Sequence, residues 1–179
     1  MNTCLDTERL VLASKKNGVS LYLFRPTIFK PLLFDYERMT IKRRLRYFRN
    51  YCRRGKYVVY YLALDKDKSF VGLCAVTPGG RGLKIQCTHN NDIILGPYYV
   101  EPTFRGKGYG KAMINMVLDC NPYNYNYAYD IIAKDNIPSV HTSKACGFEK
   151  YQEINLVGLL KKHAPTDNGE YIIFRRHCK

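Results

Sequence analysis

The sequence predicts a mixed α/β fold, in which a sheet of six to seven strands carries helices on both faces. In the second half, segments with the two-residue period of a strand alternate with segments that have the apolar spacing of a helix. Such strand–helix–strand units imply parallel strands at the centre of the sheet. In the first half, two β-rich runs flank a short polar turn, which indicates a hairpin and an antiparallel portion. A chain of 179 residues fits a single domain, taken here as residues 1–179.

The first half is predicted to contain a strand, a helical region and the hairpin. Residues 19–25 alternate and are β-rich, which predicts the first strand. Apolar residues recur at three- to four-residue steps through residues 26–55, and a break near Thr40 divides this helical stretch into two. Residues 57–64 and 70–76 are the predicted hairpin strands.

The second half is predicted to alternate between strands and helices. The expected strands are residues 93–100, 126–133, 148–156 and 171–176, and the expected helices are residues 110–118 and 136–146. The polar segment at 161–169 contains a proline and is expected to be a loop.

Composition excludes several classes of protein. No apolar run approaches the roughly 20 residues that span a bilayer, and residues 1–12 lack the apolar core of a secretory signal. We therefore expect a cytoplasmic protein without a membrane partner. The seven cysteines are an odd number and widely scattered, which argues against a disulfide framework. Neither cysteines nor histidines have the spacing of a metal site, so no metal is expected.

The clearest functional signal is the segment VEPTFRGKGYGK, from Val100 to Lys111. It follows a predicted strand and opens a predicted helix. Glycines there let the backbone turn sharply and approach a ligand closely, and the unpaired amides of a helix N-terminus favour an anion. The segment matches neither a Walker A loop nor a dinucleotide fingerprint. A pyrophosphate suits this arrangement, with Lys107 and Lys111 adding charge at the rim.

Two blocks give the sequence a specific resemblance. The run from Arg105 to Gly110 resembles the [QR]xxGx[GA] signature of the GCN5-related N-acetyltransferases (GNAT), and the residues YYVEP before it resemble the strand end of that family. Downstream, Asn136 to Ser139 together with Gly147-Phe148 resembles the NxxS/A…GF block. The resemblance covers about residues 57–157, whereas the first 55 residues match only in predicted element order.

The resemblance implies a mostly antiparallel sheet in which two neighbouring strands splay apart and hold acetyl-CoA, the co-substrate, with no metal. Carried over by position, the Tyr98 amide would face the thioester carbonyl and Val100 would pair with the pantetheine arm. The amides between Arg105 and Lys111 would hold the pyrophosphate. The residues expected to bind acetyl-CoA are Tyr98, Tyr99, Val100, Arg105, Gly106, Lys107, Gly108, Tyr109, Gly110, Lys111, Asn136 and Ser139.

The expected catalytic residues are Tyr98, Asp92 and Ser143, and two of these depart from the family pattern. Many members carry a tyrosine seven residues after the asparagine, where this chain has Ser143. Either Ser143 acts through a water, or another tyrosine serves, or the thiolate leaves unassisted. Some members carry a strand glutamate where this chain has Ile94, so Asp92 is the candidate base. The alternatives are a turn aspartate at this position and a water chain without a dedicated base.

The acceptor amine is not specified by any motif. The net charge of +14 attracts polyanions, which favours a small metabolite or a phosphate-bearing amino sugar. A protein amine or aminoacyl-tRNA is the alternative, although the aromatic residues among the arginines have core-like spacing, so nucleic acid is not favoured. A non-catalytic acetyl-CoA-binding module also stays open, because the acid and base of the family are absent. A homodimer stays open as a further partner arrangement.

Overall fold

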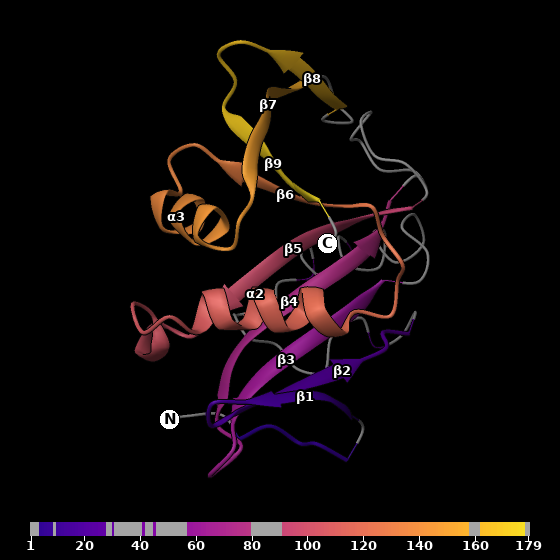
Figure 1. The fold of residues 1–179 in the computed structure, drawn as a ribbon, viewed down its shortest axis with the longest axis vertical. Coiled ribbons are helices and arrows are strands. Elements are labelled where there is room, and N and C mark those ends of the chain that lie inside the picture. The colour runs from indigo at the N-terminus through magenta and orange to yellow at the C-terminus, as the bar shows by residue number, and fades with distance from the viewer. Residues whose placement is uncertain are drawn as a thin grey trace.

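The computed structural model describes residues 4–8, 10–27, 30, 41, 45, 57–79, 91–157 and 162–177. Within them, nine strands form one sheet in the order β1-β2-β3-β4-β5-β6-β9-β7-β8 (Figure 1). All neighbouring strands are antiparallel except β5 and β6, which are parallel. The mixed, mostly antiparallel sheet is therefore confirmed, but it has nine strands rather than six or seven.

The strands are β1 (Val11–Lys16), β2 (Val19–Phe24), β3 (Val58–Leu64), β4 (Phe70–Pro78), β5 (Asp92–Val100), β6 (Tyr127–Ala133), β7 (Glu149–Val157), β8 (Lys162–Thr166) and β9 (Tyr171–His177). The described helices are the 3-10 turn η1 (Pro102–Phe104), α2 (Tyr109–Cys120) and α3 (Ile137–Ala145). Every strand and helix predicted for these segments is present, with ends that differ by at most two residues. The helical stretch predicted at 26–55 lies largely outside the described residues.

The two strands that the sequence did not predict both lie at edges of the sheet. In β1, Val11 and Leu12 are exposed, so the strand lacks a clear apolar face. The prediction of a loop at residues 161–169 is wrong, because residues 162–166 form β8 and pair with β7. Pro165 is tolerated there, because an edge strand leaves one side of its backbone without a partner strand. Edge strands need few apolar residues, which is why periodicity missed them.

The second strand–helix–strand unit does not produce neighbouring parallel strands. The unit β5–α2–β6 does, as predicted, but β9 inserts between β6 and β7 and pairs antiparallel with both. Ile173 and Phe174 of β9 are buried, whereas β8 is polar. The more apolar strand therefore takes the interior position and the polar strand takes the edge.

The main core lies between the sheet and helix α2, which crosses the middle strands (Figure 1). Met113, Ile114 and Val117 of α2 are fully buried against strands β2 to β6. Helix α3 packs on the same face through Val140. A second buried cluster, which includes Tyr61, lies apart from this core. The remaining predicted helices fall on residues outside those described.

Gly72 of β4 allows β5 to approach closely where the site begins. Gly72 faces Val100, and a Cβ on Gly72 would lie 2.4 Å from the carbonyl oxygen of Tyr99. We expect Gly72→Ala to lower the free energy of unfolding by about 1–3 kcal/mol, because the two backbones must separate. Urea denaturation measures this.

The matched control for Gly72 is Gly110→Ala, near the start of α2. A Cβ on Gly110 would meet no atom closer than 3.5 Å, and alanine favours a helix over glycine by up to about 1 kcal/mol. This variant should be as stable as the wild-type protein or more so. Wild-type stability in Gly72→Ala would show that the strands are not as close as described.

Candidate active site

The candidate site lies where strands β5 and β6 separate. The two strands pair only from Asp92 and Tyr127 as far as Leu95 and Asp130. Beyond this point β5 continues along β4, while β6 continues along β9. In β5, residues 96–97 oppose a single residue of β4, which is a β-bulge that bends the strand. The end of the pairing and the bulge in β5 together leave a gap between two parallel strands in the middle of the sheet.

The backbone of β5 offers hydrogen-bonding groups to this gap. The amide of Glu101 donates to the carbonyl of Val71 in β4, at 2.9 Å. The N–H and C=O groups of successive residues in a strand point to opposite sides. Those of Tyr98 and Val100 therefore point away from β4. The Val100 carbonyl accepts a bond of 2.9 Å from Arg105 Nε on that side. An extended ligand could therefore pair with β5 as a further strand would.

The N-terminus of α2 closes one end of the gap with unpaired amides. Gly108 is the N-cap, with φ 80°, and Gly106 has φ 73°, conformations that favour glycine. No side chain caps this helix, and its first turn has no acidic residue. The first-turn amides and the helix dipole therefore favour an anion here.

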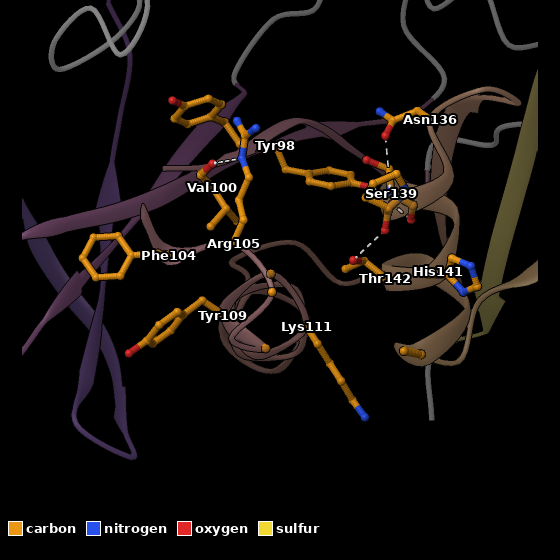
Figure 2. A pocket seen from close by; sticks show the side chains of 16 residues that line it. Tyr98, Val100, Phe104, Arg105, Tyr109, Lys111, Asn136, Ser139, His141 and Thr142 are labelled. Atoms are coloured by element: carbon orange, nitrogen blue, oxygen red, sulfur yellow. Dashed lines mark hydrogen bonds between the residues drawn. The ribbon is translucent and has the colours of Figure 1, made fainter. Parts of the chain in front are cut away.

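Helix α3 forms the opposite wall. The side-chain oxygen of Asn136 accepts a bond of 3.3 Å from the Ser139 amide, which caps the helix, and Thr142 donates to the Pro138 carbonyl at 2.9 Å. An asparagine cap of this kind contributes about 1 kcal/mol to a helix. The cap holds the start of α3 facing β5 (Figure 2).

A cavity of about 840 Å³ lies between these elements (Figure 2). Its described lining comes from the end of β5, the glycine-containing turn, the start of α2 and α3. All of the residues expected to bind acetyl-CoA line it except Lys107, whose ammonium group donates to the Thr103 carbonyl at 2.9 Å. The lining includes Arg105 and Lys111 and no acidic residue among those described, so it suits an anionic ligand.

Sequence reasoning missed several residues of the lining. These are Phe104, Pro138, His141, Thr142 and Ala145. Phe104 lies inside the recognised motif. The four residues of α3 recur at three- to four-residue steps, so a helical face read from Pro138 would have found them.

Asp92, the expected base, lies at the far end of β5, six residues before Tyr98. At 3.3 Å per residue this separation is roughly 20 Å along the strand. Asp92 is buried, and its Oδ1 accepts a bond of 3.1 Å from the Tyr127 amide where β5 and β6 begin to pair. It does not line the cavity. The structure therefore does not bring Asp92 together with the other expected residues.

Ser143, the expected acid, is fully buried in α3 and does not line the cavity. It lies beside Asp130 of β6, a buried carboxyl that the sequence analysis did not single out. Burial raises the pKa of Asp130 to about 7, and the hydroxyls of Ser143 and Tyr98 offset part of that rise. The sequence did contain a signal for this buried acid, because Asp130 is the one charged residue in the otherwise apolar and aromatic strand YAYDIIA.

Tyr98 reaches both the cavity and this buried acid. Its ring lines the cavity, and its hydroxyl donates to the Ser139 carbonyl over a long 3.4 Å (Figure 2). Burial and the neighbouring Asp130 raise the pKa of the Tyr98 phenol above its ordinary value. The raised pKa therefore keeps the proton on the phenol at physiological pH.

None of the described helices is both long and apolar enough to cross a bilayer. Among the described residues, no three or more histidine, cysteine, aspartate or glutamate side chains are grouped in a way that could hold a metal ion.

Comparison with known proteins identifies relatives of this chain. Residues 27–148 match the Acetyltransferase (GNAT) family. No curated protein matches the sequence. Three similar structures have identities low enough to inform on the fold alone.

The first is spermidine N-acetyltransferase from Vibrio cholerae in complex with CoA and spermine, with a TM-score of 0.56 and 14% identity over 88% of this chain and 95% of that one. The second is ribosomal-protein-S5-alanine acetyltransferase from Vibrio fischeri, with a TM-score of 0.60 and 11% identity over 93% of this chain and 97% of that one. The third is yncA from Salmonella typhimurium with its cofactor acetyl-CoA. It has a TM-score of 0.55 and 12% identity over 90% of this chain and 94% of that one.

Proposed function

The chain belongs to the GNAT family of acetyltransferases, and on that premise we propose that it transfers an acetyl group from acetyl-CoA to a primary amine. The observation that carries this proposal is the cavity where β5 leaves β6, which ends at the uncapped N-terminus of α2. An elongated molecule with a diphosphate in its middle fits a slot with an edge of strand backbone and an anion-binding end.

In this arrangement, the backbone of Tyr98 and Val100 pairs with the pantetheine arm. The amides at the start of α2 hold the pyrophosphate, with Lys111 at the rim. Asn136 and Ser139 border the arm from α3. Acetyl-CoA supplies the activated acetyl group, and the residues of this chain bind and orient it.

The reaction is a direct attack of a neutral amine on the thioester carbonyl. The carbonyl oxygen becomes an oxyanion, and we assign its stabilising donor to the Tyr98 amide, which points into the gap. We assign no residue to removal of the amine proton, because Asp92 lies away from the cavity and no acidic side chain is among its described lining residues.

For the acceptor, we propose a small amine that carries phosphate, such as a phosphorylated amino sugar. The net charge of +14 raises the local concentration of anions and repels polycations. This argues against a polyamine, although a structurally similar enzyme acts on spermidine. A protein amine is the second candidate, since another similar structure is an acetyltransferase of a ribosomal protein.

The test is acetyl-CoA-dependent thiol release with a panel of amines. The panel contains glucosamine 6-phosphate, glucosamine, spermidine and a peptide with N-terminal alanine. We expect kcat/KM to be at least tenfold higher for the phosphorylated sugar than for glucosamine, with a difference that shrinks as salt screens the charges. A preference for spermidine or the peptide would redirect the acceptor assignment. Stabilisation by acetyl-CoA without thiol release from any amine would instead indicate a non-catalytic binding module.

A further inference from the structure

Asp130 is a buried acid beside Tyr98, a residue that lines the cavity. It is the last residue of β6 that pairs with β5, so it lies where the two strands separate. The residue is 2% exposed, and its Oδ2 has no hydrogen-bond partner among the described residues. No described cation forms an ion pair with it either. A buried carboxyl with one oxygen left unpaired is costly, and an apolar side chain would serve the core better. Such groups occur where a protein uses them.

The polar and titratable groups that face Asp130 come from β4, β5 and α3 with its C-cap, whereas β9 places the apolar Phe174 opposite it. Tyr98 comes from β5, Cys74 from β4, and Ser143 and Cys146 from α3 and its C-cap. Burial raises the pKa of both thiols, so they are neutral at physiological pH. Two basic groups, Arg176 and Lys111, act on Cys146.

Tyr98 connects this buried acid to the cavity. Its phenol lies beside Asp130, and its ring forms part of the cavity wall. Ser143 lies beside the same acid, but it is fully buried and forms none of the wall. Ser143 stands where the resemblance to the family leads one to expect a tyrosine. Helix α3 therefore contributes no tyrosine to the cavity, whereas β5 contributes Tyr98.

Resting on the function proposed above, we propose that the Tyr98 hydroxyl protonates the departing thiolate and that Asp130 resupplies the proton. When the tetrahedral intermediate collapses, the C–S bond breaks and its electron pair passes to sulfur. The Tyr98 O–H proton moves to that sulfur, which gives the free thiol of CoA. The proton of the neutral Asp130 carboxyl then restores the phenol, and Asp130 regains its proton from solvent after product release. Tyr98 is the proton donor, and Asp130 is a positioning residue that acts through it.

The first test is Tyr98→Phe, with Tyr151→Phe as its matched control. Tyr151 is an exposed phenol on β7 that does not line the cavity. We expect Tyr98→Phe to lower kcat about 100-fold with little change in the KM for acetyl-CoA, whereas Tyr151→Phe keeps the wild-type kcat. Wild-type kcat in Tyr98→Phe would overturn the inference and leave the proposed function intact. Absence of turnover by the wild-type protein would overturn both.

The second test is Asp130→Asn, read as a pH profile. Because the amine titrates equally in both proteins, the ratio of wild-type to variant kcat isolates the carboxyl. We expect a ratio of about 10 at pH 6 that falls toward 1 above the pKa of Asp130, near 7. A ratio that does not change with pH would overturn the role of Asp130.

A third readout needs no activity. Carboxyl ¹³C NMR of the free wild-type protein should show one aspartate that titrates near pH 7, and Asp130→Asn should lack this signal. If every aspartate titrates below pH 5, Asp130 carries no proton to resupply and the relay is excluded. This measurement also holds if Asp130→Asn folds poorly, since the wild-type spectrum alone shows whether such a group exists.

Discussion

Replacing Gly108 with glutamate should abolish the rise in melting temperature that acetyl-CoA gives the wild-type protein, while the protein stays folded. Gly108 is the N-cap of α2, and a Cβ there would meet nothing within 4 Å. The new carboxylate therefore fits, but it places a negative charge where the first-turn amides would hold the pyrophosphate. The positive φ of 80° costs a non-glycine residue only about 1–2 kcal/mol, which leaves a stable domain folded.

The effect is large enough to measure by thermal unfolding. A ligand at 100 times its Kd stabilises the folded protein by about 2.7 kcal/mol, which for a chain of this size is a shift of about 5–10 °C. The wild-type protein should show this shift, and Gly108→Glu should show none.

Gly18→Glu is the matched control for backbone strain and added charge. Gly18 has φ 77°, a Cβ there also meets nothing within 4 Å, and the residue lies in the turn between β1 and β2, outside the cavity. This variant should lose a similar amount of intrinsic stability but keep the full acetyl-CoA shift. An unchanged shift in Gly108→Glu would place the pyrophosphate elsewhere.

Much of the lining of the cavity could be predicted from the sequence, because its determinants are local. Gly106 and Gly108 predict positive φ angles just before helix α2, and Asn136 predicts the N-cap of helix α3. Each signal lies within a few residues of the element that it helps to define. Local signals of this kind also predicted the bounds of the central strands and their order along the chain, but not their order in the sheet. The edge strands β1 and β8 were missed because only pairing with a neighbour, not burial, makes them strands.

Which acid lies near the cavity could not be predicted, because this depends on register between distant segments. Asp92 and Asp130 are both acids in strands, and the sequence does not tell which of them lies by the cavity. Parallel pairing of β5 with β6 decides this by placing Asp130 beside Leu95, at the point of separation, and Asp92 at the opposite end. The same pairing, together with the bulge in β5, brings Tyr98 over Asp130.

The stability of Asp130→Asn relative to the wild-type protein should rise as the pH increases from about 4 to 7. An unfolded aspartate loses its proton near pH 3.8, whereas burial holds the folded Asp130 protonated to about pH 7. Between these values the folded state binds the extra proton, so the wild-type free energy of unfolding falls by up to about 1.4 kcal/mol per pH unit. The total is on the order of 4 kcal/mol, and the asparagine variant has no such loss. Urea denaturation at each pH from 4 to 8 measures the difference.

Glu153→Gln provides a control with the opposite sign. Lys134 and Lys150 hold the pKa of Glu153 at about 2, so this carboxylate stabilises the folded protein above pH 4.5 and loses that effect as the pH falls toward 2. The difference between Glu153→Gln and the wild-type protein should therefore be flat from pH 6 to 8 and shrink only in acid. Asp130→Asn should instead gain stability relative to the wild-type protein between pH 4 and 7, a change of opposite sign at higher pH. Two curves with the same slope would mean that Asp130 is ionised in the folded protein, and a charged Asp130 would have no proton to pass to Tyr98.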